Sequence, residues 1–85
     1  MENELVYVPN RARAMEMTEN LIEESEGKVS GEYVYLYPPG IPLIVPGERV
    51  DQACIDKIRE YEKKGLKVRG MADPDGKTIK IINEQ

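Results

Sequence analysis

Residues 37–48 read YPPGIPLIVPGE, and this stretch constrains the backbone more than any other part of the chain. Proline fixes φ and removes an amide donor, so neither a helix nor a central strand can run through positions 38–42. The residue before each proline is held in an extended conformation. The apolar run at 43–45 that follows favours burial. The sequence therefore predicts a stiff, apolar loop of defined shape at the middle of the chain.

Downstream of this loop the pattern predicts a helix over residues 49–64. Its apolar stripe recurs at helical spacing and consists of Cys54, Ile55, Ile58 and Tyr61. Asp51 suits the N-cap or the first turn of the helix, and Gly65 is the expected stop. Because Cys54 lies on the apolar stripe, we interpret it as a core residue and not as a reactive thiol.

Two strands are predicted near the C-terminus, over residues 66–72 and 78–82. The segment Asp73–Gly76 between them reads as a turn, because proline fixes φ and Asp and Gly suit turn positions. In the second strand Ile79 and Ile81 share one face.

Upstream of the loop, a strand is predicted over residues 32–37, in which the side chains alternate between two faces. Tyr33, Tyr35 and Tyr37 share one face, with Val34 and Leu36 on the other. We interpret the tyrosines as packing against a neighbouring layer. A stacking platform for single-stranded nucleic acid would carry interleaved basic residues, and none occurs here.

The N-terminal part is predicted to hold a strand over residues 5–8, stopped by Pro9, and an amphipathic helix over 10–26. The helix prediction is weakened by its charges, because arginines lie near its positive end and glutamates near its negative end. A break near Thr18, which would cap a second short helix, is the alternative. The resulting order is β-α-β-loop-α-β-β over residues 1–85. This order indicates a small α+β domain, with about two helices packed on a short mixed sheet.

The amino-acid composition indicates which classes of partner and which cellular location are expected. The chain has 85 residues, a net charge of −4 and 33% charged residues, which is typical of a soluble protein. Nucleic acid is not an expected partner, because no clustered basic surface is present to neutralise phosphates. Residues 1–48 carry nine acidic and three basic side chains. This acidic half either is an ordinary solvated surface or attracts a basic ligand by its long-range field. The longest uncharged run, residues 33–47, is too short to span a bilayer, and the acidic N-terminus lacks a signal peptide. We expect a cytoplasmic protein without membrane contacts, which also fits a single cysteine.

The sequence excludes most catalytic arrangements. Histidine is absent, and Cys54 is the only cysteine. Catalytic triads and zinc sites are therefore not expected. We predict neither a catalytic residue nor a metal ligand in this chain.

Two segments together resemble a known family signature. They are GKVSGE at residues 27–32 and YPPGIPLIVPGE at 37–48. In the C-terminal domain of ornithine/lysine/arginine decarboxylases, a Gly-Arg-Ile-x-Ala-like segment precedes Tyr-Pro-Pro-Gly-(Ile/Val)-Pro and then Pro-Gly-Glu. The resemblance covers about residues 9–83. Lys28 and Gly31 depart from the family's usual arginine and alanine.

The resemblance implies a role without catalysis. Full-length family members are fold-type I enzymes in which a Ser-x-His-Lys segment binds pyridoxal phosphate, and a chain without histidine cannot contain that segment. We therefore expect no cofactor in this chain. The family implies that the domain covers the active-site entrance, aids assembly and has the large pyridoxal-phosphate domain as its partner. A homo-oligomer formed through the apolar loop is a further expectation. Arginine, lysine and ornithine all remain open as the parent substrate.

Candidate site residues follow from the resemblance. The predicted docking loop comprises Tyr37, Pro38, Pro39, Gly40, Ile41, Pro42, Pro46 and Gly47. Glu32 and Glu48 are candidates for attracting the cationic tail of a basic amino acid, since a guanidinium or ammonium needs a carboxylate partner. In the competing interpretation, Glu48 caps the following helix and Glu32 is an ordinary strand-end residue. A stand-alone binding or regulatory module, recognising a basic amino acid, a polyamine or a protein, is the alternative function. Whether the chain is an excised fragment or a complete gene product stays open.

Overall fold

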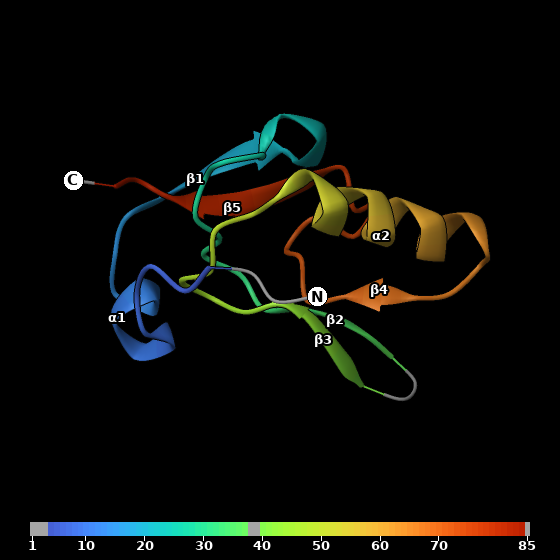
Figure 1. The fold of residues 1–85 in the computed structure, drawn as a ribbon, viewed down its shortest axis with the longest axis horizontal. Helices are drawn as coiled ribbons and strands as arrows, with labels where there is room; N and C mark the ends of the chain where they lie inside the picture. Colours follow the sequence, from blue (N-terminus) through green and yellow to red (C-terminus); the bar gives the residue numbers. More distant parts are fainter. Residues whose placement is uncertain (1–3, 38–39, 85) are drawn as a thin grey trace.

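The computed structural model describes residues 4–37 and 40–84 and confirms the α+β class with two helices (Figure 1). The helices are α1 (Pro9–Arg13) and α2 (Gln52–Lys63), with a short 3-10 turn, η1 (Ile22–Glu24). The strands are β1 (Met17–Leu21), β2 (Val34–Leu36), β3 (Ile41–Ile44), β4 (Val68–Arg69) and β5 (Thr78–Ile82). They form two antiparallel sheets, of order β1-β5 and β3-β2-β4.

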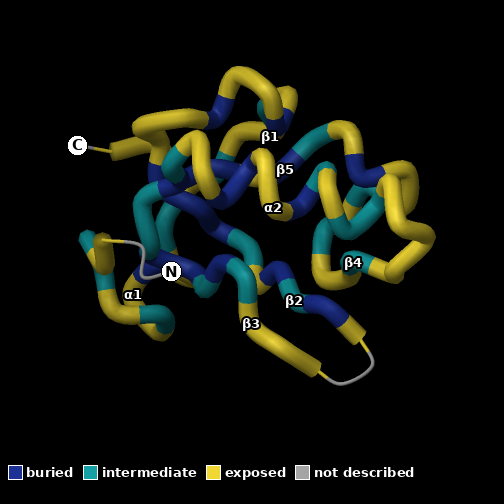
Figure 2. Tube along the Cα trace, turned by 45° about the vertical axis from the view of Figure 1, so that its right-hand side comes forward, coloured by how far each residue is buried: buried dark blue, intermediate teal, exposed yellow. Residues whose placement is uncertain are grey.

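The main core lies where α2 faces the two sheets, and buried segments of both sheets converge there in Figure 2. Its buried members are Ile22, Val34, Ile44, Val50, Cys54, Ile55, Ile58, Ile79 and Ile81. A smaller cluster of Ala12, Val29 and Ile82 lies on the other side of β5. The predicted alternation of this strand is confirmed, because Ile79 and Ile81 enter one cluster and Ile82 the other.

The predicted helix over residues 10–26 is wrong beyond its first turn, because α1 ends at Arg13. Residues 17–21 are a strand that pairs along its whole length with β5, from Met17 opposite Ile82 to Leu21 opposite Thr78. The alternative break, with Thr18 capping a second helix, is also wrong because Thr18 pairs with Ile81. The isoleucine-rich β5 needs a partner for its backbone, and this long-range pairing outweighs a local helical pattern already opposed by its charges.

The predicted strand over residues 5–8 is reduced to one bridge, between Leu5 and Glu48. The Gly47 carbonyl accepts hydrogen bonds from the amides of both Val6 and Tyr7, at 2.8 and 3.1 Å. This segment therefore crosses the end of the signature loop instead of entering a sheet.

The helix predicted over residues 49–64 is confirmed as α2. The Asp51 carboxylate accepts a hydrogen bond from the Cys54 amide at 2.7 Å, as an N-cap should, and Gly65 follows the helix at φ 80°. Cys54 is buried in the main core, as expected.

The last two strands are present but do not pair with each other, because β4 pairs with β2 whereas β5 pairs with β1. The predicted turn at 73–76 is present, with the Gly76 amide donating to the Asp73 carbonyl at 3.1 Å. However, Gly70 has a φ of 103° and lies against the Tyr33 carbonyl, which turns the chain out of the three-stranded sheet before this turn begins. No helix in residues 4–37 and 40–84 has the length and apolar character needed to cross a membrane.

Candidate functional site

The signature stretch forms the β2–β3 hairpin and the loop that follows it. Leu36 pairs with Ile41, and the Gly40 amide donates to the Leu36 carbonyl at 2.7 Å. Tyr37, Gly40, Ile41 and Pro42 are all exposed, so this end of the predicted docking loop is accessible. The predicted loop residues Pro38 and Pro39 lie outside the described residues.

The other end of the signature stretch is interior. Pro46 and Gly47 are buried. The Gly47 amide donates to the Ser30 carbonyl at 2.8 Å, while its own carbonyl holds the N-terminal segment. These two residues therefore organise the domain itself, and only the hairpin end of the predicted docking loop reaches the surface.

Glu48 stabilises the loop in which it lies. Its Oε1 atom accepts a hydrogen bond from the Val45 amide at 2.7 Å, and its own amide donates to the Val45 carbonyl at 3.1 Å. The interpretation that Glu48 caps the following helix is wrong, because Asp51 occupies the N-cap of α2.

Both carboxylate oxygens of Glu32 accept hydrogen bonds from backbone amides. Oε2 accepts from the Ala72 amide at 2.7 Å and Oε1 from the Lys80 amide at 2.8 Å. The buried Ser30 hydroxyl fixes the backbone of Glu32 with two hydrogen bonds: it accepts from the Glu32 amide at 3.0 Å and donates to the Glu32 carbonyl at 2.8 Å. Glu32 thus joins β5 and the loop after β4 to the start of β2. Its partners are unrelated to those of Glu48, and the described contacts do not unite the two glutamates in one site.

Sequence reasoning missed an ion-pair network on α2 that centres on Arg59. The guanidinium contacts Glu62 at 2.6 Å and the Gly76 carbonyl at 3.1 Å, and it also pairs with Glu23 of η1. Burial opposes the charge of Arg59, but hydrogen bonds to Glu62 and Glu23 outweigh it and raise the pKa. The pair of Arg59 and Glu62 could have been predicted from the sequence, because residues three positions apart are neighbours on a helix surface. The contact of Arg59 with Glu23 could not have been predicted in this way, because the two residues are 36 positions apart.

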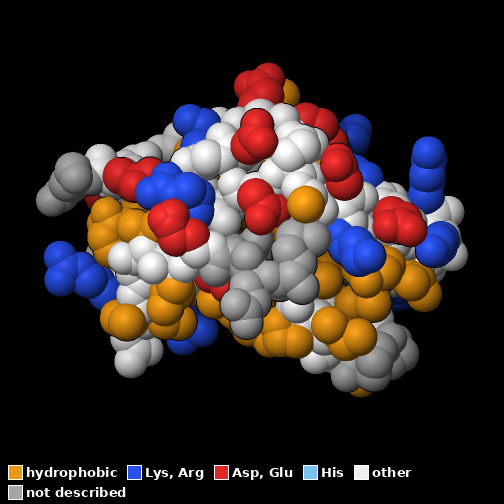
Figure 3. All heavy atoms as spheres, viewed as in Figure 1, with side chains coloured by type: hydrophobic (Ala, Val, Ile, Leu, Met, Phe, Trp, Pro, Cys, Tyr) orange, Lys and Arg blue, Asp and Glu red, His pale blue; other side chains and the backbone are white. Residues whose placement is uncertain are grey.

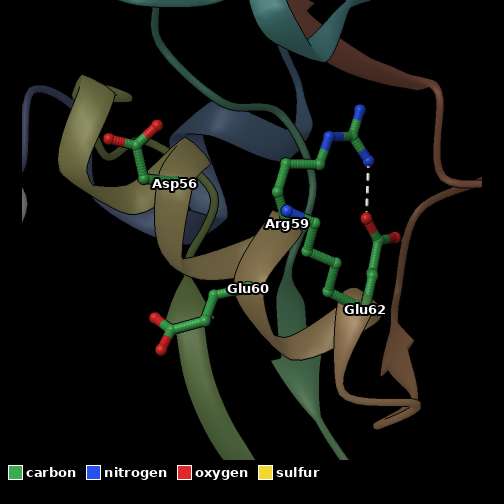
Figure 4. Close-up of a pocket in the computed structure, with 5 residues that line it drawn as sticks. Asp56, Arg59, Glu60 and Glu62 are labelled. Carbon is green, nitrogen blue, oxygen red and sulfur yellow. Dashed lines mark hydrogen bonds and ion pairs between the residues drawn. The ribbon is translucent and has the colours of Figure 1, made fainter.

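The hollow beside this network is charged and open. It is lined by Asp56, Arg59, Glu60, Glu62 and Lys63. Figure 4 shows Asp56 and Glu60 directed away from the Arg59–Glu62 pair. Arg59 already has the carboxylate partners Glu62 and Glu23, so its guanidinium is not an unpaired cation within the hollow.

The residues do not fit pyridoxal phosphate. A Schiff-base lysine lies in an enclosed site that excludes water, but every lysine of this chain is at an exposed position. Within residues 4–37 and 40–84, no group of three or more Asp, Glu, Cys or His side chains could hold a metal ion.

Within the described residues, one face of the three-stranded sheet is partly exposed, with Tyr33 and Tyr37 exposed and Tyr35 half-buried. We call this surface the tyrosine face and define it as Tyr33, Tyr35, Tyr37 and Arg69. Val34 and Leu36 point into the domain and are buried, which confirms the predicted alternation. The neighbouring layer expected over the tyrosines is not found in the described part of the chain, because Tyr33 and Tyr37 remain 38% and 54% exposed.

The sequence of the chain is similar to one known family and to part of several longer proteins. The family model for the C-terminal domain of Orn/Lys/Arg decarboxylase matches residues 2–74. The chain is 39% identical over 62 residues to the arginine decarboxylase of Halalkalibacterium halodurans, covering 73% of this chain and 13% of that protein. It is 38% identical over 64 residues to the arginine decarboxylase of Bacillus subtilis, covering 75% of this chain and 13% of that protein. The chain thus spans a small part of the relatives it matches.

Solved structures agree with these matches. A Francisella novicida lysine decarboxylase superposes with a TM-score of 0.82 at 27% identity, over 98% of this chain and 14% of that chain. A constitutive lysine decarboxylase of E. coli gives a TM-score of 0.79 at 23% identity, over the same shares, and shows likeness of fold.

Proposed function

The chain belongs to the family of Orn/Lys/Arg decarboxylase C-terminal domains, and from this premise we propose that it is the accessory domain of a basic-amino-acid decarboxylase. In this role it covers the active-site entrance and helps to hold the assembled enzyme, and it supplies no catalytic group. The observation that carries the proposal is the match of 98% of this chain to a 14% portion of a lysine decarboxylase. A fold found inside a much longer enzyme chain is expected to work in contact with the rest of it.

The side chains of this domain indicate that catalysis is carried out by the large domain. Decarboxylation of an amino acid needs an electron sink, which pyridoxal phosphate supplies when it is bound. Because the lysines here are exposed and histidine is absent, the cofactor and its lysine are assigned to the large domain. Arginine or lysine is the substrate class that the relatives favour, and the product would then be agmatine or cadaverine, compounds of polyamine metabolism. A cytoplasmic location is part of the same proposal.

A domain exchange tests this function. The C-terminal domain of the Bacillus subtilis arginine decarboxylase is replaced by residues 1–85, and release of CO2 from arginine is compared with that of the enzyme truncated before this domain. The proposal expects the chimera to be more active than the truncated enzyme. It also expects no CO2 release by the isolated chain with added pyridoxal phosphate. A chimera no more active than the truncated enzyme would contradict the accessory role.

The alternative, a stand-alone module that binds a basic amino acid or polyamine, gives a different result in calorimetry. Arginine, lysine, ornithine and agmatine are titrated into the isolated chain. Glu32 already accepts two backbone hydrogen bonds, so the accessory role expects no binding tighter than about millimolar. Tighter binding that is lost in Glu32→Gln would favour the alternative.

A further inference from the structure

We propose that the tyrosine face is the surface through which this domain packs on the large decarboxylase domain. The inference rests on the proposed accessory function and adds the location of the interface. The register of the sheet builds the face: Tyr35 lies directly opposite Arg69, and side chains of opposed residues in an antiparallel pair project to the same side.

The opposite side of the same sheet is already occupied. Leu36 lies opposite Val68. Leu36 is buried, and Val68 packs against the main core, where α2 contacts β3 and β4. A sheet with one covered face and one partly exposed aromatic face gains further burial when another polypeptide surface packs on the second face. Figure 3 shows charged side chains along the β1 and η1 side of the molecule, while hydrophobic atoms gather along the opposite side, around the β2–β3 hairpin.

The chemistry of the face is that of a protein interface. The rings of Tyr33 and Tyr35 lie 5.4 Å apart, centroid to centroid, and are tilted by 50°. Tyrosine and arginine are enriched where binding energy concentrates, because each combines a large contact area with hydrogen-bond donors. Within the residues that the structure describes, the guanidinium of Arg69 forms no ion pair and the Tyr33 and Tyr35 hydroxyls have no hydrogen-bond partner.

The length of the related enzymes indicates which polypeptide packs on the tyrosine face. The chain corresponds to 13% of the two arginine decarboxylases and 14% of the lysine decarboxylase, so in proteins of this kind a far longer polypeptide adjoins the domain. The face also runs into the accessible hairpin end at Tyr37 and Ile41, which belongs to the signature stretch. A partner surface that offers apolar side chains and one carboxylate for Arg69 would complement it.

Binding in trans tests the location. The chain is titrated into the Bacillus subtilis arginine decarboxylase truncated before its C-terminal domain, and amide hydrogen exchange of the chain is compared with and without it. We expect protection of β2 and β4. Tyr33→Ser and Arg69→Glu should each weaken binding by about tenfold or more, and Tyr33→Phe should weaken it less than Tyr33→Ser. Leu21→Ser is the matched control, because Leu21 is 48% exposed but lies on β1 in the other sheet, and it should leave the affinity within about twofold.

The outcomes separate the two proposals. Binding with protection confined to β1, η1 or α2, and unaffected by Arg69→Glu, would overturn the location and leave the accessory function standing. The accessory function fails as well if the chain does not bind the truncated enzyme and the chimera releases no more CO2 than the truncated enzyme. Dimerisation of the isolated chain in sedimentation, lost in Tyr33→Ser and in Arg69→Glu but not in Leu21→Ser, would assign the face to a second copy and contradict the proposed occupant. Circular dichroism of each variant checks that the fold is intact, and the exposed Arg69 position provides the test if Tyr33→Ser unfolds.

Discussion

Gly47 lies directly against the backbone of Tyr7: a Cβ atom added to Gly47 would come within 1.8 Å of the Tyr7 carbonyl oxygen. This contact is where the N-terminal segment crosses the signature loop, and the same glycine has a φ of 94°. The Pro-Gly-Glu part of the signature therefore closes the domain on itself, whereas the hairpin part faces outward.

Gly47→Ala should prevent stable folding or cost about 3 kcal/mol or more of unfolding free energy, since the backbone must shift and a side chain must adopt positive φ. Gly40→Ala is the matched control. Gly40 has a similar φ of 82° but nothing within 4 Å of the added Cβ, so its cost should be about 1–2 kcal/mol. Urea unfolding of both variants measures the difference. Equal losses of stability would contradict the tight crossing at Tyr7.

Glu32→Gln should destabilise the domain by about 1–3 kcal/mol, because an amide can accept from only one of the two backbone donors and leaves the other without a partner. The Ala72 and Lys80 amides should then exchange faster in hydrogen-exchange measurements. Glu60→Gln is the control. Glu60 forms an exposed pair with Lys64, and such pairs contribute about 0–1 kcal/mol. Unchanged exchange at both amides would refute the structural role of Glu32.

Asp73 gives the domain an acid-sensitive turn. Hydrogen bonding from the Asp75 backbone amide lowers the pKa of Asp73, supported by the Lys77 and Thr78 amides and against a smaller opposing effect of desolvation. A carboxyl group whose pKa is lower in the folded state stabilises the fold above its unfolded pKa, and this contribution is lost as the pH falls through the folded value. Stability should therefore decline below about pH 4, and Asp73→Asn should reduce that decline while lowering stability at neutral pH. Urea midpoints between pH 2 and pH 7, with Asp75→Asn as the control in the same turn, test this. An unchanged pH profile in Asp73→Asn would contradict it.

Gly31 and Met17 should be energetically coupled. A Cβ on Gly31 would come within 2.5 Å of the Met17 sulfur, which is part of a flexible side chain. Gly31→Ala should thus cost about 1 kcal/mol with Met17 present and less in the Met17→Ala background. A double-mutant cycle of unfolding free energies measures the coupling, and strictly additive effects would show that the side chain moves aside without cost.

Sequence-based prediction succeeded for features that are determined by residues close together in the chain. The cap at Asp51, the stripe of α2 and the stop at Gly65 are set within a few turns, and all three were predicted. The β1 strand was mistaken for helix because its partner, β5, lies about 60 residues away and its own pattern does not reveal the pairing. The predicted α+β class is nevertheless confirmed, because Cys54, Ile55 and Ile58 of the predicted α2 stripe and Ile79 and Ile81 of β5 are in the main core. Tyr61, the last member of that stripe, is only half-buried.

The candidate site was less predictable for the same reason. The proline-rich stretch identified the segment, but nothing in it separates the outward hairpin at Ile41 from the interior Gly47. Glu32 was noted for its charge, whereas its described partners are backbone amides 40 and 48 positions away. Such contacts form only when distant segments meet, so composition and spacing cannot reveal them.

The domain exchange decides whether this chain works as the accessory domain of a larger decarboxylase. CO2 release from arginine is measured for the Bacillus subtilis enzyme that carries residues 1–85 in place of its own C-terminal domain, and for the same enzyme truncated before that domain. We predict higher activity in the chimera, and we predict that this gain falls in the Arg69→Glu chimera but not in the Leu21→Ser chimera. Equal activity of the chimera and the truncated enzyme would contradict the account.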